Sequence, residues 1–92
     1  MPVRGEAEIP MANFGGIMNW KAEGTGAILI QSRHDRYYRA TFMSPCYDLP
    51  YAEDIRFATG AIDTLDRFDS VIVRGHQCFF RTFEEIPKPE KF

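Results

Sequence analysis

The chain has 92 residues, a formal net charge of −2 at pH 7, 45% hydrophobic residues and 14% aromatic residues. This length suits one small domain, and the apolar content excludes a disordered chain. The charge argues against a general nucleic-acid-binding protein, and the longest apolar run, Ala27–Ile30, is far shorter than the roughly 20 residues of a membrane span.

The first half of the chain predicts three strands. Residues 17–22 (IMNWKA) alternate as a half-buried strand does, and residues 27–31 (AILIQ) have the short apolar run of a central strand. A glycine-containing turn joins them at residues 23–26. After a polar loop, the alternation returns at residues 37–43 (YYRATFM). The side chains expected on the inner face of this third strand are Tyr38, Ala40 and Phe42.

The second half predicts a turn, a short strand and a hairpin. Pro45 ends the third strand because proline lacks the ladder N–H donor. Residues 48–57 (DLPYAEDIRF) favour one helical turn that leads into a strand at 55–59. The connection at residues 60–69 is rich in turn residues, and we expect Leu65 and Phe68 to pack on the core.

The hairpin of residues 70–74 and 77–83 is predicted to turn at Gly75-His76, with Gly75 at positive φ and His76 exposed. Alternation then places one set of side chains inward and another outward. The expected pairs are Arg74 with Gln77, Val73 with Cys78 and Ile72 with Phe79; Cys78 and Phe80 face inward, whereas Phe79 and Arg81 face outward.

Together these elements predict a mainly β fold, either a small antiparallel barrel or a strongly bent sheet of five to six short strands with at most one helical turn. The predicted domain covers residues 15–86. Residues 1–14 are predicted to be a flexible N-terminal tail, and residues 87–92 a C-terminal tail.

The sequence offers little support for metal binding or catalysis. His34, Cys46, His76 and Cys78 match the ligand count of a zinc site, but not the usual ligand spacing. Cys78 lies among apolar residues that raise a thiol pKa, and no glycine-rich phosphate loop is present. We therefore expect no catalytic residue, no metal and no cofactor. Two cysteines in a small domain are compatible either with a disulfide or with two buried thiols.

The best candidate for ligand binding is the basic and aromatic stretch RHDRYYR at residues 33–39. On an acidic protein, however, the favoured interpretation of this stretch is a loop and strand whose arginines are solvated and pair with nearby carboxylates. The candidate binding residues are Arg36, Tyr37, Arg39 and Arg74, together with Phe79, which would mark a binding patch.

The order of GGIMNW, AILIQ, YYRATFMSPCYDLPYAEDIRF, LDRFDSVIVRG and HQC resembles a bacterial family of small exported proteins of unknown function. The resemblance covers about residues 15–83. It differs from many members in lacking further cysteines near Ala12 and Thr64–Leu65, and this chain shows no signal peptide. The resemblance implies a periplasmic or secreted protein, and in that oxidising setting a disulfide between Cys46 and Cys78.

We therefore expect a non-enzymatic binding or interaction module of the bacterial envelope, with an unknown protein partner or with self-association through a sheet edge. The alternative is a small barrel that binds single-stranded nucleic acid or an anionic ligand through its arginines, although nucleic acid is the less favoured partner.

Overall fold

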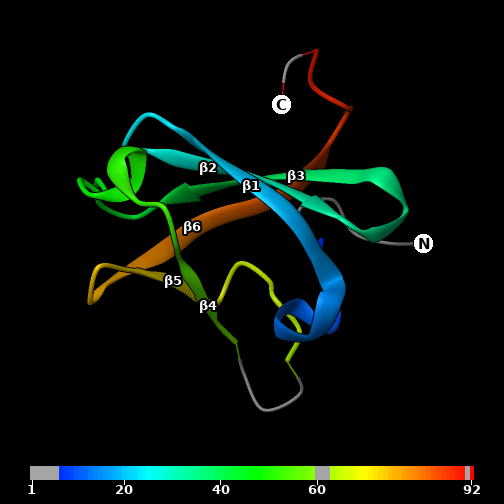
Figure 1. The fold of residues 1–92 in the computed structure, drawn as a ribbon, viewed down its shortest axis with the longest axis horizontal. Coiled ribbons are helices and arrows are strands. Elements are labelled where there is room, and N and C mark those ends of the chain that lie inside the picture. Colours follow the sequence, from blue (N-terminus) through cyan, green and yellow to red (C-terminus); the bar gives the residue numbers. More distant parts are fainter. Residues whose placement is uncertain (1–6, 60–62, 91) are drawn as a thin grey trace.

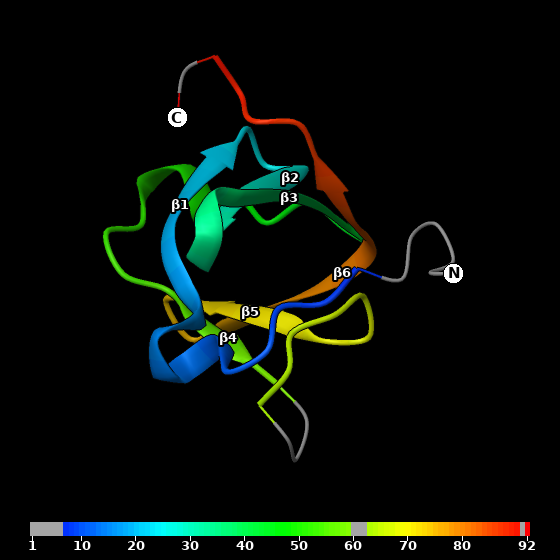
Figure 2. The same ribbon diagram turned by 90° about the vertical axis from the view of Figure 1, so that its right-hand side faces the viewer.

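The computed structural model describes residues 7–59, 63–90 and 92, which form one six-stranded antiparallel sheet. The strands are β1 (Ile17–Glu23), β2 (Ala27–Ser32), β3 (Arg36–Phe42), β4 (Arg56–Ala58), β5 (Ser70–Val73) and β6 (His76–Ile86). Their order in the sheet is β1-β2-β3-β6-β5-β4, and the sheet curls into a half-barrel (Figures 1 and 2). The predicted mainly β fold is confirmed.

The concave face of the sheet holds the hydrophobic core. Alternation places Tyr38, Ala40 and Phe42 of β3 inward as predicted, with exposed fractions of 7% or less. The other buried core side chains contributed by strands are Ile28, Ile30, Val71, Val73, Phe80 and Phe83. Phe80 lies between Phe42 and Phe83, with ring centroids 5.7 and 5.6 Å away, so aromatic contacts join β3 to β6.

A β-bulge in β6 explains why Phe80 and Phe83 are both buried although they are three residues apart. Phe42 of β3 pairs with Phe80, whereas the preceding Thr41 pairs with Thr82, so Arg81 has no partner in the ladder. The extra residue restores the inward direction at Phe83. Strict alternation from Phe80 would have turned Phe83 to the outer face.

Short helical turns lie before and between the strands. The predicted helical turn is the 3-10 turn η3 (Leu49–Tyr51), whose Leu49 is fully buried, and the strand that follows is shorter than the predicted 55–59. Two further turns are the π turn η1 (Ala12–Gly16) and the 3-10 turn η2 (Arg33–Asp35). Among the described residues, no helix has the length and apolar character needed to cross a membrane.

The N-terminal segment, residues 7–13, packs on the core, so the packed domain begins earlier than the predicted Gly15. Ile9 is 1% exposed and forms two backbone hydrogen bonds with Leu65, at 2.8 and 2.9 Å. Asn13 donates from its backbone and side chain to the carboxylate of Asp63, and also from its side chain to the carbonyl of Phe57 in β4. Burial alone would raise the pKa of Asp63, but these hydrogen bonds and one from Thr59 hold it below its ordinary value.

The β5–β6 hairpin turns one residue earlier than predicted. Its central residues are Arg74 and Gly75, with φ of 50° and 84°, because Val73 pairs with His76. Two positive φ values define the primed turn that matches strand twist, and glycine suits its second position. Val71, not Val73, therefore lies opposite Cys78.

The predicted Arg74–Gln77 and Ile72–Phe79 pairs are also wrong, because Ile72 pairs with Gln77 and Ser70 with Phe79. Moving the turn by one residue changes each pairing by two residues, so the direction of each side chain is kept. Phe80 is buried, and Phe79 and Arg81 are exposed, as predicted.

Phe68 does not pack on the core, in contrast to the prediction, whereas Leu65 is fully buried as expected. The side chain of Phe68 is 78% exposed, and the guanidinium carbon of Arg67 lies 4.6 Å from its ring centroid. The backbone N–H of Phe68 donates to Asp66, whose own N–H donates to Asp69. These side-chain hydrogen bonds stabilise a tight turn that leaves Phe68 outside the core.

Candidate functional site

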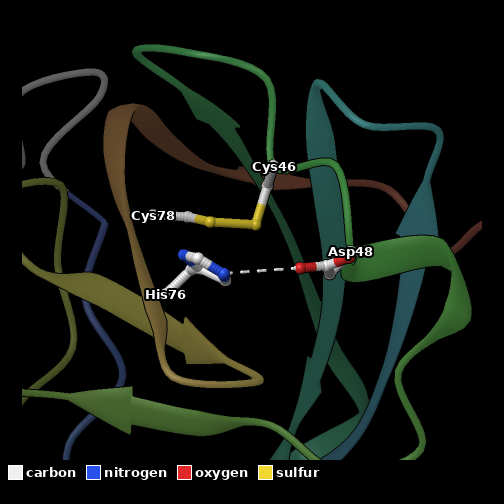
Figure 3. The surroundings of a disulfide bond; sticks show 4 residues. All are labelled: Cys46, Asp48, His76 and Cys78. Atoms are coloured by element: carbon white, nitrogen blue, oxygen red, sulfur yellow. Dashed lines mark ion pairs between the residues drawn. A yellow bond between two sulfur atoms is a disulfide. The ribbon is translucent and has the colours of Figure 1, made fainter.

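A disulfide joins Cys46, in the loop after β3, to Cys78 in β6 (Figure 3). The two Cα atoms are 5.8 Å apart, and the cysteines are 32 residues apart in the sequence. The backbone N–H of Cys46 donates to the carbonyl of Thr25, which anchors the loop to the β1–β2 turn. The predicted disulfide is confirmed.

Large apolar side chains surround this disulfide on the protein surface. Two shallow pockets of about 280 and 260 Å³ adjoin it, and both are lined by Pro45, Gln77 and Cys78. Tyr47 lines the first pocket, while Met43 and Phe79 line the second. We call this surface the disulfide face; it comprises Met43, Pro45, Tyr47, Gln77 and Phe79 together with the two cysteines.

His76 and Asp48 lie beside the disulfide. The Nε2 atom of His76 is 3.9 Å from the Oδ2 atom of Asp48, and the pair is charged on both sides only when the histidine is protonated (Figure 3). His34 lies in η2, at the opposite end of β3. Because the two cysteine sulfurs are bonded to each other, the four residues considered for zinc do not form a tetrahedral ligand set. Across residues 7–59 and 63–90, no three histidine, cysteine or acidic side chains gather to hold a metal ion.

The structure does not bring the predicted binding arginines together. Arg39 of β3 forms a bidentate pair with Glu23 of β1, with its Nε 2.9 Å from Oε1. Arg36, at the start of β3, lies 3.7 Å from Glu85. Arg74, in the hairpin turn, donates to the carbonyl of Tyr51 at 2.9 Å.

Tyr37 is buried on the outer face of β3, with 5% of its surface exposed. Its hydroxyl donates to Asp35 at 3.1 Å, and its ring meets the ring of Phe92 edge-on at 5.4 Å. Lys88 lies 3.8 Å from the same aspartate, so the predicted C-terminal tail contacts the sheet. Burial, followed by the hydrogen bond and the charge of Asp35, raises the pKa of Tyr37.

Of the candidate binding residues, Phe79 alone belongs to the disulfide face. Reasoning from sequence did not include Met43, Pro45 and Tyr47 in a site. The available signal was their position in the stretch MSPCY, where apolar side chains flank a cysteine in a loop. Pro45 and its polar neighbours indicated only the end of a strand, so this stretch did not predict that its apolar side chains gather on one surface.

Residues 3–91 match the model of a family of unknown function, DUF6491. No match is found among curated proteins, and none among solved structures. The match spans nearly the whole chain and covers every strand of the half-barrel. The chain therefore belongs to this family of unknown function, DUF6491.

Proposed function

We propose that this chain is a non-enzymatic interaction module of the bacterial envelope, and that it binds a protein partner through the disulfide face. The main supporting observation is that three large apolar side chains are exposed around the Cys46–Cys78 disulfide. Met43, Tyr47 and Phe79 are 67%, 71% and 50% exposed. Clustered exposed apolar groups are typical of interaction surfaces, where methionine and aromatic residues are enriched.

The anchoring of this surface supports the proposal further. Cys78 and Phe79 lie in the long strand β6, and the backbone N–H of Met43 donates to the carbonyl of Phe79 at 2.9 Å. The disulfide fixes the Pro45–Tyr47 loop to the same strand. A rigid surface loses little conformational entropy when a partner binds, which favours affinity.

The disulfide also supports a location in the envelope. Disulfides form and persist in the periplasm and outside the cell, whereas cytosolic thiols are mostly kept reduced. A bacterial periplasmic or secreted protein is therefore the setting that we propose for this chain.

The alternative, binding of single-stranded nucleic acid through the arginines, has less support. Arg39 is paired with Glu23 of β1 and Arg36 with Glu85 of β6, whereas Arg74 lies at the far end of the sheet. Nucleic-acid binding calls for a continuous basic face with stacked aromatic side chains.

The proposal is tested by site-specific photo-crosslinking in intact bacteria that express the full chain. A crosslinking amino acid replaces Tyr47 or Phe79 in two variants, and Met18 of β1, which is 64% exposed, in the control. We expect a discrete protein adduct from the two positions on the disulfide face and none from Met18. An adduct of twice the chain mass would identify the partner as a second copy.

A purified complex then provides the quantitative test. Phe79→Ser should weaken partner binding by about tenfold or more, as loss of a central aromatic anchor does. Met18→Ser should leave it unchanged. The proposal is wrong if all three crosslinking positions give the same pattern, or if trapping of free thiols in intact cells finds both cysteines reduced.

A further inference from the structure

A further pocket lies at the end of β3 opposite the disulfide face, between the N-terminal segment and η2. Its volume is about 340 Å³, and the residues that matter for its chemistry are Pro10, Met11, Arg33, His34, Arg36 and Tyr38. This volume is at the lower end of the range of small-molecule sites, about 300 to 1,000 Å³. Apolar and cationic side chains therefore line one space large enough for a small organic ligand.

Tyr38 contributes a buried polar group to this pocket. It is 4% exposed, and its ring stacks on Phe83 with centroids 5.6 Å apart. Within the described part of the chain, the Tyr38 hydroxyl forms no side-chain hydrogen bond. Every fully enclosed side-chain oxygen or nitrogen in that part has a partner, so the Tyr38 hydroxyl is not fully enclosed. Because Tyr38 lines the pocket, its hydroxyl is available as a donor to a ligand there.

The rim of the pocket is positively charged. Arg33 and His34 form no ion pair within the described residues, and Arg36 keeps 61% of its side chain exposed beside Glu85. Glu8 also lines the pocket and offsets part of the charge. Because Glu85 offsets the charge of Arg36, the electrostatic preference for an anion rests mainly on Arg33.

We propose that this pocket binds a small organic anion that carries an apolar group. The anionic head lies between Arg33 and Arg36 and accepts a hydrogen bond from the Tyr38 hydroxyl. The apolar part packs on Pro10 and Met11. This site does not depend on the disulfide face, so the two proposals stand or fall separately.

The test uses the purified full chain labelled with ¹⁵N and two probes of equal length, sodium hexanoate and 1-hexanol, which differ in charge. Amide resonances are followed during each titration. We expect hexanoate to shift the amide resonances of Glu8, Ile9, Met11 and residues 33–38 in a saturable manner, with Tyr47 and Phe79 unaffected. Hexanol should bind at least several-fold more weakly. Equal binding of both probes, or equal binding of inorganic phosphate, would overturn the proposal.

Variants distinguish the loss of a direct ligand contact from the effect of a change in net charge. Tyr38→Phe removes one hydroxyl and keeps the ring, so it should weaken hexanoate binding about threefold while leaving stability unchanged. Arg33→Gln should weaken it about fivefold or more, since hydrogen bonds to charged groups are the stronger ones. Arg81→Gln, an equal charge change at an exposed position of β6, is the matched control and should bind as the wild type does. Unchanged affinity in both Tyr38→Phe and Arg33→Gln would show that the anion binds elsewhere.

Discussion

Gly75 shows how one residue determines a hairpin. Arg74 has a φ of 50° and Gly75 has a φ of 84°, so the chain reverses between Val73 and His76. A left-handed conformation costs an L-residue roughly 1–2 kcal/mol, and glycine avoids that cost at one of the two positions. The placement of Cys78 opposite Val71, and hence the position of the disulfide, follows from this turn.

Gly75→Ala should therefore lower the free energy of unfolding by about 1–2 kcal/mol. The matched control is Gly26→Ala, because an added Cβ at Gly26 meets no atom within 4 Å and its φ lies outside the left-handed region. Urea denaturation of the two variants measures the difference. Equal midpoints for both would contradict this account of the turn.

At the scale of elements, the disulfide connects parts of the sheet that the chain order separates. The ladder joins β3 to β6, and the Cys46–Cys78 bond joins the loop after β3 to the same strand, across a separation of 32 residues. The bond closes a loop that contains η3, β4 and β5. Its main effect is to reduce the conformational freedom of the unfolded chain.

Reduction of the disulfide should lower the free energy of unfolding by about 3–4 kcal/mol, the chain-entropy value for a loop of this length. Urea denaturation with and without reductant measures the change. The Cys46→Ser/Cys78→Ser double variant should match the reduced wild type and should not respond to reductant. A reduced wild-type protein with an unchanged midpoint would show that the bond contributes nothing to stability.

At the scale of the whole molecule, the open side of the half-barrel is covered by the N-terminal segment. Ile9 and Ala12 are buried, and Ile9 bridges to Leu65. Asn13 donates to the carbonyl of Phe57 in β4, an edge strand of the sheet. The segment thus covers apolar surface and donates a hydrogen bond to an edge strand.

Ile9→Ala should cost about 2–4 kcal/mol of unfolding free energy, as truncation of a fully buried aliphatic side chain does. Met18→Ala, at an exposed position, should change it by less than about 0.5 kcal/mol. Thermal and urea unfolding measure both variants. An effect of Ile9→Ala no larger than that of Met18→Ala would mean that residues 7–13 are a dispensable extension.

The strands could be predicted from sequence because alternation is a local property. Tyr38, Ala40 and Phe42 alternate with polar neighbours, and a pleated strand converts that period into a buried face. Alternation alone does not account for the burial of Phe83, because the bulge at Arg81 depends on how β6 pairs with β3. The expected packing of Phe68 on the core was wrong because the side chains of Asp66 and Asp69 stabilise a turn that leaves it outside.

The disulfide face could likewise be predicted only in part. Cysteine count and family resemblance indicated the Cys46–Cys78 bond, and alternation indicated the exposure of Phe79. The gathering of Met43 and Tyr47 around that bond depends on the path of a loop, to which no periodicity applies.

Sequence by itself determined the antiparallel sheet, its inward face and the glycine turn, because periodicity and backbone freedom act between neighbours in the chain. Only the tertiary structure decided which distant residues meet. Ile9 closes the half-barrel, and Arg33, Arg36 and Tyr38 surround one pocket. Such contacts arise from sheet curvature and strand order, which are the sum of many weak interactions rather than the property of any one segment.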